Sequence, residues 1–278
     1  MNLIKNRKVG FIGAGNMGQA IMKALVDTQT VAPGNLYATN RSPGKLKKVE
    51  EQFGVKPLST NEDLVDTCDI IVLAVKPQDL AGVLEPIASS FHDGHLVISL
   101  AAGFSLKSLQ RLLPSVKGLA RAMPNTPATI QKAVVGYCLA DNAETYQASV
   151  EEFLQPLGLV VPTEEGETFE ALTVSCGSGT GFVLELMQYW QEWIEEHGFD
   201  PATARKMVVQ TFLGAAALAD KSESTSLVEL QDRVVSKKGV TAAGLQSMRE
   251  LELERGLRYS FEKAAIRDQE IERGTARQ

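Results

Sequence analysis

The sequence has few of the side chains that bind metals or form disulfides, with three cysteines and three histidines among 278 residues. Cys68, Cys138 and Cys176 lie far apart, in neither a C-x-x-C nor a metal-ligand spacing. A disulfide framework and a zinc site are both poorly supported, and a reducing compartment fits better. His92 and His95 lie in the polar segment FHDGH, which we interpret as a surface turn rather than a metal pair. We expect no metal site.

The sequence also lacks long apolar runs and an excess of positive charge. No run reaches the length of about eighteen apolar residues that indicates a transmembrane helix. Near the N-terminus the apolar run behind Lys8 breaks at Gly13, which is too short for a signal peptide. The formal net charge is −6, so we expect no general affinity for nucleic acid or an anionic membrane. These absences favour a cytoplasmic protein in which any anion site is local.

Short apolar runs in the first half of the chain predict a sheet. They lie at 7–12, 35–39, 69–75, 95–100, 116–121, 133–140 and 157–163. Several are continuous rather than alternating, which is typical of parallel strands covered by helices on both faces. Helical spacing at 16–27, directly after the first run, agrees with this. We therefore predict a doubly wound α/β domain over residues 1–163.

The pattern changes after residue 163. Three segments with helical spacing follow one another there, at 169–198, 201–221 and 244–274. Gly198 followed by Pro201 indicates that one helix ends and the next begins. We therefore predict an all-helical second domain over residues 164–278.

The segment GAGNMG, residues 13–18, follows the first predicted strand and opens the first predicted helix. Its glycines permit a tight turn, close approach of a pyrophosphate and close packing of the helix on the strand. The helix N-terminus adds N–H groups and a positive dipole for the phosphates. Such a spacing also occurs in structural turns, but the strand–turn–helix context favours a dinucleotide site. Its expected cofactor contacts are Gly13, Ala14, Gly15, Asn16, Met17 and Gly18.

The acidic residue that usually ends the second strand of an NAD-binding domain is missing. The chain has Asn40, Arg41 and Ser42 there. A carboxylate at this place binds the ribose hydroxyls and would repel a 2′-phosphate. Arg41 can pair with that phosphate, and Asn40 and Ser42 can donate hydrogen bonds to it. We therefore expect NADPH rather than NADH; in the alternative interpretation Arg41 is only a solvated surface charge.

Two further strand ends carry candidate cofactor contacts. The run at 69–75 leads into Ala74, Val75, Lys76 and Pro77, at the carboxyl end where α/β sheets bind ligands. The run at 95–100 ends in SLAAG, residues 99–103, whose small side chains would let a nicotinamide ring lie against the backbone. Small residues after a strand also occur in ordinary turns.

Three more segments carry a specific resemblance: RAMPNTPA at 121–128, TVSCGSGTGF at 173–182 and LQDRVVSKKGVTAAGL at 230–245. Together with GAGNMG, NRS and AVKPQ, they make the chain similar to the pyrroline-5-carboxylate reductases, NAD(P)H enzymes that form L-proline. The match runs in order over nearly the whole chain. The resemblance implies a Rossmann-type domain followed by a helical dimerisation domain whose long helices interlock between two subunits, with dimers that assemble into decamers.

An apolar stripe in the second domain is consistent with such a dimer. It consists of Phe182, Leu186, Tyr189, Trp190 and Trp193. A stripe at this spacing is as easily an intrachain core, so periodicity alone does not decide between the two. Only the resemblance favours the dimer.

The resemblance also implies the remaining site residues. The carboxylate of a small cyclic imino acid would be held by backbone N–H groups at a helix start, made by Ser236, Gly239, Val240 and Thr241. The Thr241 hydroxyl would face the ring nitrogen as the catalytic group. Asn61 would contact the adenosine side of the cofactor. The nicotinamide side would be contacted by Ala101, Ala102, Met123 and Pro124.

Two segments depart from the usual pattern of the family. Its Ser-Gly-Ser-Gly-Pro-Ala-Tyr is replaced by residues 176–182, CGSGTGF, and its Pro-Gly-Gly-Thr-Thr by residues 237–241, KKGVT. We predict hydride transfer to the cyclic C=N bond of 1-pyrroline-5-carboxylate, a chemistry that needs no strong general acid. Because of the two departures, a paralogous reductase for another cyclic imino acid or a 2-oxo or hydroxy acid stays open as an alternative. A non-catalytic NADPH-sensing module is the other alternative.

Overall fold

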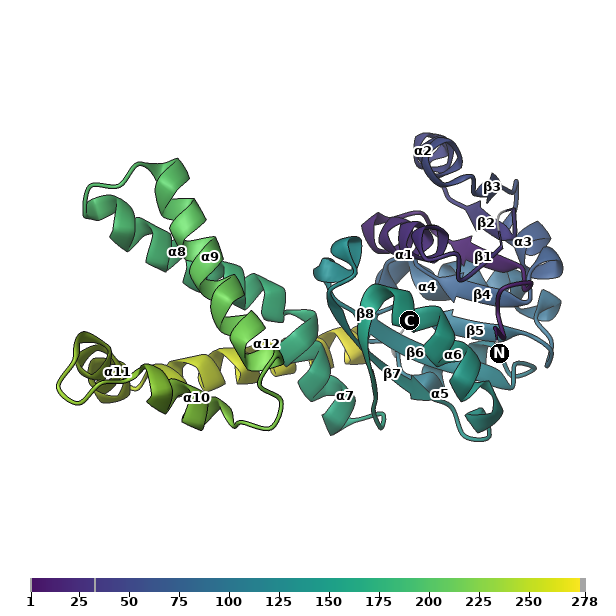
Figure 1. The fold of residues 1–278 in the computed structure, drawn as a ribbon. Coiled ribbons are helices and arrows are strands. Elements are labelled where there is room, and N and C mark those ends of the chain that lie inside the picture. The colour runs from purple at the N-terminus through teal and green to yellow at the C-terminus, as the bar shows by residue number, and fades with distance from the viewer. Residues whose placement is uncertain (1, 33, 276–278) are drawn as a thin grey trace. The chain divides into compact units, whose positions relative to one another are not determined.

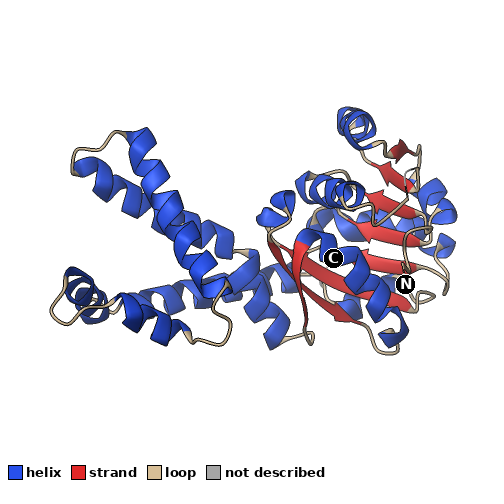
Figure 2. Cartoon of the chain, viewed as in Figure 1, coloured by secondary structure: helices blue, strands red, loops and turns tan. Residues whose placement is uncertain are grey.

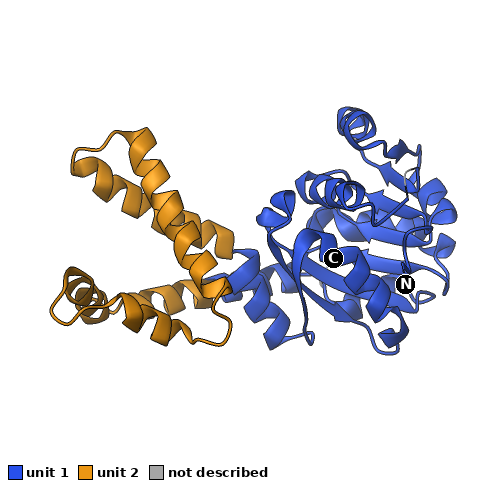
Figure 3. Cartoon of the chain, in the orientation of Figure 1, with its two compact units in different colours: residues 1–178, 264–278 blue, residues 179–263 orange. Residues whose placement is uncertain are grey.

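The structure is a computed structural model that describes residues 2–32 and 34–275 (Figure 1). It divides into two compact units (Figure 3). The first holds Met1–Ser178 and Ala264–Gln278, and the second holds Gly179–Lys263. The sequence analysis places the domain boundary at 163 instead, and it does not anticipate that the end of the chain returns to the first unit. The return is made by helix α12 (Leu253–Thr275), whose residues are shared between the two units.

The first unit is built on one eight-stranded sheet in the order β3-β2-β1-β4-β5-β6-β7-β8. Its strands are β1 (Val9–Ile12), β2 (Leu36–Thr39), β3 (Lys56–Pro57), β4 (Ile70–Leu73), β5 (Leu96–Ser99), β6 (Gly118–Pro124), β7 (Ala133–Leu139) and β8 (Gly158–Pro162). The predicted doubly wound α/β fold is thereby confirmed. Among the described strands, only β6 and β7 pair antiparallel, because the short connection between them has no crossover helix to reverse the chain direction.

Helices cover both faces of the sheet (Figure 2). They are α1 (Asn16–Asp27), α2 (Pro43–Phe53), α3 (Asn61–Thr67), α4 (Pro77–Leu84), α5 (Leu106–Leu112), α6 (Gln147–Leu154) and α7 (Glu167–Leu172). Alternate residues of one strand belong to different cores: Ile70 and Val72 pack with Ile21 of α1, whereas Ile71 and Leu73 pack with Leu80 of α4. Both faces of the strand are buried, which is why its sequence is continuously apolar.

The second unit consists of helices alone (Figure 2). They are α8 (Gly179–Glu196), α9 (Pro201–Asp220), α10 (Leu227–Val234), α11 (Val240–Glu250) and the first part of α12. The predicted break between α8 and α9 is confirmed: Gly198 has a φ of +95°, and Pro201 begins α9 after the N-cap Asp200. Two predicted helices are wrong in length. The segment 169–198 is interrupted by a π-helical turn, η5 (Thr173–Gly177), and 244–274 breaks near Glu252, which has a φ of +51°.

The second unit leaves most of its apolar stripe uncovered within one chain. Its described core is small, formed by Ile194, Ala204 and Val208 with Met187 and Phe212 against them. Leu186, Tyr189, Trp190 and Trp193 of the stripe are exposed, Trp193 to 58%. The interpretation of these residues as an intrachain core is therefore wrong. An exposed apolar face of this extent is typical of a surface that binds another protein chain. None of the described helices is long and apolar enough to cross a membrane.

The polar segment at 92–95 is only partly a surface turn. His95 is 3% exposed, so its expected surface position is wrong. Its ring stacks on that of His92 with centroids 3.7 Å apart, and its Nδ1 accepts a hydrogen bond from the His92 N–H at 3.2 Å. Burial lowers the pKa of His95, with a smaller contribution from His92. A neutral imidazole that accepts a backbone hydrogen bond has a structural role here.

An ion pair between a buried arginine and a more exposed glutamate joins β6 to the segment before α7. The guanidinium of Arg121 binds the Glu165 carboxylate at 2.7 Å and lies 4.3 Å from the centre of the Phe169 ring. The same Glu165 oxygen accepts a hydrogen bond from the Leu106 N–H at 2.7 Å. These contacts hold the start of α5 and the start of α7 against β6. Burial raises the pKa of Asp268, on α12, against the opposing effect of Arg121.

The end of α12 packs on the loop that follows β5. Gln269 donates hydrogen bonds to both carboxylate oxygens of Glu170, at 3.0 and 3.1 Å. Ile271 lies over Gly103, where a Cβ atom would come within 2.5 Å of the Ile271 Cγ2. Gly103 also has a φ of +62°, in the left-handed region that glycine favours.

We expect Gly103→Ala to lower the free energy of unfolding by about 1–3 kcal/mol, because the new methyl group overlaps Ile271 and the backbone conformation is strained. Urea unfolding of the purified protein measures this. The matched control is Gly82→Ala in α4, where no atom lies within 4 Å of the new Cβ. It should stabilise by about 0.5–1 kcal/mol. Equal free energies of unfolding for the two variants would contradict the close contact between Gly103 and Ile271.

Candidate cofactor site

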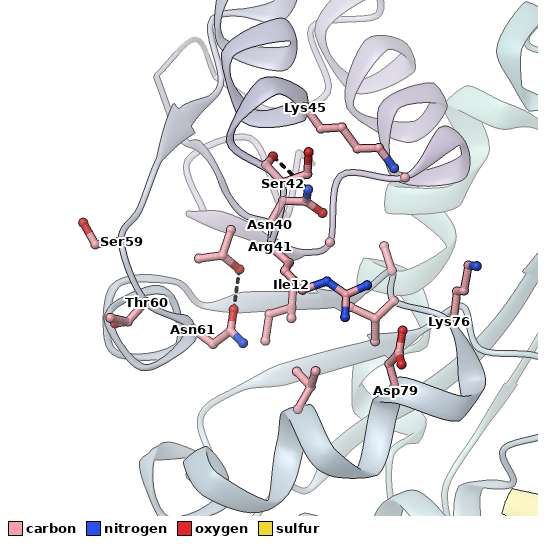
Figure 4. A pocket seen from close by; sticks show the side chains of 16 residues that line it. Ile12, Asn40, Arg41, Ser42, Lys45, Ser59, Thr60, Asn61, Lys76 and Asp79 are labelled. Atoms are coloured by element: carbon pink, nitrogen blue, oxygen red, sulfur yellow. Dashed lines mark hydrogen bonds between the residues drawn. The ribbon is translucent and has the colours of Figure 1, made fainter.

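A cavity of about 510 Å³ lies at the carboxyl ends of β1, β2 and β4 (Figure 4). The strand order reverses between β1 and β4, and in open α/β sheets ligands bind outside such a switch point. Nine of the predicted cofactor contacts line the cavity: Gly13, Gly15, Asn40, Arg41, Ser42, Asn61, Ala74, Val75 and Lys76. Predicted contacts in the same segments that do not line it are Ala14, Asn16, Met17, Gly18 and Pro77.

The glycine loop approaches the end of β4 closely. A Cβ atom on Gly13, whose φ is +106°, would lie 2.7 Å from the Ala74 carbonyl oxygen. On Gly18 it would lie 3.0 Å from the Gly13 carbonyl oxygen. Gly15 differs, because its Cβ would have only one neighbour within 4 Å, the Ala74 oxygen at 3.9 Å. Gly13 and Gly18 thus permit the packing of the loop, whereas Gly15 leaves room on the cavity side for a ligand.

Gly15 is also the N-cap of α1. No side chain caps this helix, and no acidic residue lies in its first turn. The first N–H groups of an α-helix have no partner inside the helix, and the helix dipole is positive there. This end of α1 is therefore suited to bind the pyrophosphate of a dinucleotide.

The Asn40 side chain ties the glycine loop to the turn after β2. Its Oδ1 accepts a hydrogen bond from the Ala14 N–H at 3.1 Å, and its Nδ2 donates to the Ser42 carbonyl at 3.0 Å. One amide hydrogen stays available for a ligand. Asn40 thus has a structural role that the sequence analysis did not anticipate, next to the predicted hydrogen bond to a phosphate.

Three cations line the cavity: Arg41, Lys45 and Lys76, together with one acid, Asp79. In Figure 4 the Arg41 side chain extends into the cavity. The sequence analysis missed Lys45, which lies in the first turn of α2, three residues after the N-cap Ser42. That spacing places a side chain one helical turn from the cap and could have indicated it. The charge here is positive, although the whole chain carries −6.

Asn61 lines the cavity from the start of α3. Its Oδ1 accepts a hydrogen bond from the Thr39 hydroxyl at 2.6 Å, which leaves its Nδ2 hydrogens for a ligand. Ser59 and Thr60 line the same part of the cavity and were missed by the sequence analysis. Thr60 caps α3 by accepting a hydrogen bond from the Asp63 N–H.

The predicted nicotinamide contacts do not line this cavity. Ala101 and Ala102 follow β5, and Met123 and Pro124 end β6. Strands β4, β5 and β6 are parallel, with Leu73 paired to Ser99 and Ser99 to Arg121. These four residues therefore lie at the same edge of the sheet as the cavity, further along the strand order.

The predicted substrate residues gather at the N-terminus of α11, in the second unit. Gly239 is the N-cap of this helix, and no side chain caps it. The Gly239 N–H donates to the Ser236 carbonyl at 3.0 Å, and a Cβ on Gly239 would lie 2.1 Å from the Ser236 Oγ. Val240 is 94% exposed, and Thr241 follows it in the first turn. The four residues thus form one helix start with uncapped N–H groups.

Cys68 and Cys138 are buried and do not line the cavity. Burial raises the pKa of the Cys68 thiol to about 12, and burial likewise raises that of Cys138 to about 12. Both thiols are therefore protonated and unreactive near neutral pH. Nowhere in residues 2–32 and 34–275 do three metal-ligating side chains come together.

Comparison with known proteins identifies the family. A family model described as "NADP oxidoreductase coenzyme F420-dependent" matches residues 8–103, and one described as "Pyrroline-5-carboxylate reductase dimerisation" matches residues 166–271. The pyrroline-5-carboxylate reductase of Methanosarcina acetivorans is 34% identical over 96% of this chain and 97% of its own. The chain belongs to the pyrroline-5-carboxylate reductase family. It is thus an oxidoreductase with a nucleotide-binding fold, and its dimerisation domain indicates a homo-oligomer.

Solved structures of this family are similar over the whole chain. The pyrroline-5-carboxylate reductase of Coxiella burnetii has a TM-score of 0.88 and 29% identity, covering 96% of this chain and 98% of that one. The Plasmodium falciparum enzyme, solved with NADP bound, has a TM-score of 0.85 and 25% identity, covering 97% of this chain and 99% of that one. The arrangement of a Rossmann-type domain with a helical dimerisation domain is therefore that of the family.

We expect Gly15→Ala to weaken NADPH binding and to lower the free energy of unfolding by only about 1 kcal/mol or less, because alanine is a poorer helix N-cap than glycine. Its methyl group meets no protein atom closer than 3.9 Å but occupies the place where a pyrophosphate approaches the helix start. The expected loss of affinity is about tenfold, or about 1.4 kcal/mol, measured by titration of NADPH. Gly44→Ala in α2, where no atom lies within 4 Å of the new Cβ, is the control. Native affinity in Gly15→Ala would exclude this helix start as the pyrophosphate site.

Proposed function

We propose that this chain reduces 1-pyrroline-5-carboxylate to L-proline with NADPH. The likeness to pyrroline-5-carboxylate reductases over nearly the full length of both chains carries this proposal. The cavity at the switch point of the sheet supports it, because the open side of Gly15 and the uncapped start of α1 fit a dinucleotide. When bound, NADPH would supply a hydride from C4 of its nicotinamide to C5 of the protonated C=N bond, giving a secondary amine and NADP+.

The choice of NADPH over NADH rests on the cations and hydroxyl groups beside β2. Arg41 and Lys45 would pair with a 2′-phosphate, and the Ser42 hydroxyl would donate a hydrogen bond to it. The place where an NAD-binding domain has a carboxylate is taken by Asn40, which puts no negative charge there. The Plasmodium falciparum relative has NADP bound in its structure, which supports the same choice.

The helix start at Gly239 is the proposed cradle for the substrate carboxylate. Its uncapped N–H groups and the helix dipole suit an anion, and Ser236 adds a hydroxyl group. Thr241 would hold the ring nitrogen through its hydroxyl and so orient the C=N bond. A cyclic imine is basic enough to be protonated in part near neutral pH. The residues therefore need to hold the reacting carbons together and exclude water more than to supply a proton.

The assembly that we propose is a dimer through the helices of the second unit, with further assembly into decamers. The exposed Leu186, Tyr189, Trp190 and Trp193 support a dimer, because a second copy would bury them. Location in the cytoplasm stays a prediction from the sequence.

Turnover of purified protein tests the proposed reaction. With 1-pyrroline-5-carboxylate present, oxidation of NADPH should be rapid, and proline should accumulate in equal amount. Oxidation only with a six-membered cyclic imino acid would favour the paralogous reductase that the altered segments 176–182 and 237–241 leave open. Binding of NADPH without oxidation by any cyclic imine would favour the sensing module.

We expect Arg41→Ala to raise the KM for NADPH strongly and the KM for NADH little. A hydrogen bond to a charged group contributes about 1.5–3 kcal/mol, so the expected change for NADPH is roughly tenfold or more. Lys45→Ala should act in the same direction. Lys48→Ala, an exposed cation on α2 that does not line the cavity, is the control. Equal effects of Arg41→Ala on the KM for NADPH and the KM for NADH would show that Arg41 does not bind the 2′-phosphate.

We expect Thr241→Ala to lower kcat by roughly ten- to a hundredfold while the KM for NADPH stays near its native value, because the hydroxyl group orients the substrate only. Thr241→Ser keeps the hydroxyl group and should retain most of the turnover. Steady-state kinetics with both substrates varied separates the two effects. Unchanged turnover in Thr241→Ala would exclude the orienting role.

A further inference from the structure

One turn of π-helix, η5 (Thr173–Gly177), connects α7 to α8. Such turns are rare and frequently occur at functional sites. The carbonyl of Cys176, near the end of η5, accepts a hydrogen bond from the Nδ2 of Asn125 at 3.0 Å. Asn125 follows β6 directly and occupies the N-cap position of the short helical turn η2 (Thr126–Ile130), where its side chain makes no capping hydrogen bond. A side chain from the end of a strand thus holds the backbone of the π turn.

Both ends of the Asn125 amide are bound. Its Oδ1 accepts a hydrogen bond from the Val134 N–H on β7 at 3.1 Å, while its Nδ2 donates to Cys176. A carbonyl on one side and an N–H on the other allow only one orientation of the amide. Asn125 is 8% exposed, so water competes little for these bonds. Three segments, the end of β6, β7 and η5, therefore meet at one side chain.

This side chain lies next to the predicted nicotinamide contacts. Met123 and Pro124 precede Asn125 in the chain and end β6. Gly177 of η5 packs on Met123, since a Cβ on Gly177 would lie 3.5 Å from the Met123 Cγ. The bond between Asn125 and Cys176 consequently sets how closely the π turn approaches Met123.

We propose that Asn125 is a positioning residue for hydride transfer, because it fixes the π turn at Thr173–Gly177 against Met123 and Pro124. The inference rests on the proposed reductase function. Hydride transfer depends steeply on the distance between the two carbons, and a displacement of about 1 Å can cost about a hundredfold in rate. The adenosine half of the cofactor would bind at the cavity beside β1, β2 and β4, which Asn125 does not line. Loss of Asn125 should therefore affect the reaction more than the affinity.

Asn125→Asp tests this with a side chain of the same shape. Its carboxylate can still accept the hydrogen bond from Val134, but it places an oxygen beside the Cys176 carbonyl, where the native amide donates. We expect kcat to fall roughly ten- to a hundredfold at pH 8, with the KM for NADPH within about twofold of the native value. A protonated carboxyl group can donate again. The ratio of the variant's kcat to the native kcat should therefore rise as the pH falls.

Asn125→Ala removes both hydrogen bonds and should lower kcat at every pH, without this recovery. Asn6→Asp makes the same chemical change at an exposed position and should leave kcat unchanged. Melting temperatures identify any variant that does not fold. A native kcat in Asn125→Asp at all pH values, or equal losses in kcat and in NADPH affinity, would overturn the positioning role.

The fluorescence emission of bound NADPH tests the positioning role of Asn125 without requiring turnover of the proposed substrate. The nicotinamide fluoresces more strongly in an ordered apolar site than in water, so Asn125→Asp should lower the emission at an unchanged Kd. If the native protein does not oxidise NADPH with 1-pyrroline-5-carboxylate, the proposed reaction has failed, and this readout alone decides the positioning role. Native emission in Asn125→Asp would then overturn it.

Discussion

The close approach of Gly13 to the Ala74 carbonyl is the constraint on which the cofactor cavity depends. Strands β1 and β4 lie side by side in register, so the loop that leaves β1 must pass over the end of β4. Any side chain on Gly13 would overlap that carbonyl at 2.7 Å. Because the loop fits, α1 begins with its uncapped N–H groups beside the cavity, and the turn after β2 reaches the loop through Asn40. The proposed phosphate-binding end of the site follows from this packing of backbone on backbone.

The second half of the chain buries its apolar residues differently from the first half. The sheet unit buries its apolar residues on both faces, whereas the helical unit has a small described core and exposes large aromatic side chains such as Tyr189 and Trp190. A helical unit with so little internal apolar burial depends on another surface for stability. The dimerisation model that matches residues 166–271 covers these helices. Folding of this unit and assembly of the protein are therefore expected to be coupled.

Local sequence patterns predicted the elements well where burial and turn chemistry agreed. Continuous apolar runs located the strands, and Gly198 with Pro201 located the break between α8 and α9. The π turn at Thr173–Gly177 escaped prediction, because one extra residue in a helix changes no periodic pattern strongly enough to be seen. The return of α12 to the first unit depends on contacts between distant segments, such as Gln269 with Glu170, that periodicity does not contain.

The residues of the candidate site also divide into those that a local motif predicts and those whose position depends on distant parts of the chain. The glycine loop and the Asn40-Arg41-Ser42 segment were predictable, because each has a fixed place after a strand. Lys45 was missed since a lysine on a charged helix resembles any solvated cation until its position over the cavity is seen. The role of Asn125 depends on two partners, Val134 and Cys176, of which the second is far away in the sequence. Cys176 lies 51 positions after Asn125, and no local motif encodes the pairing.

The positive lining of the cavity within an acidic chain has a consequence for the approach of the cofactor. A dinucleotide phosphate is an anion, so at long range it is repelled by the net charge of −6, and it is attracted only close to Arg41, Lys45 and Lys76. The Debye length is about 8 Å at physiological ionic strength, so dissolved salt screens the distant repulsion more completely than the attraction at contact. We therefore expect the rate of encounter between cofactor and protein to fall less with added salt than it would for a chain of positive net charge.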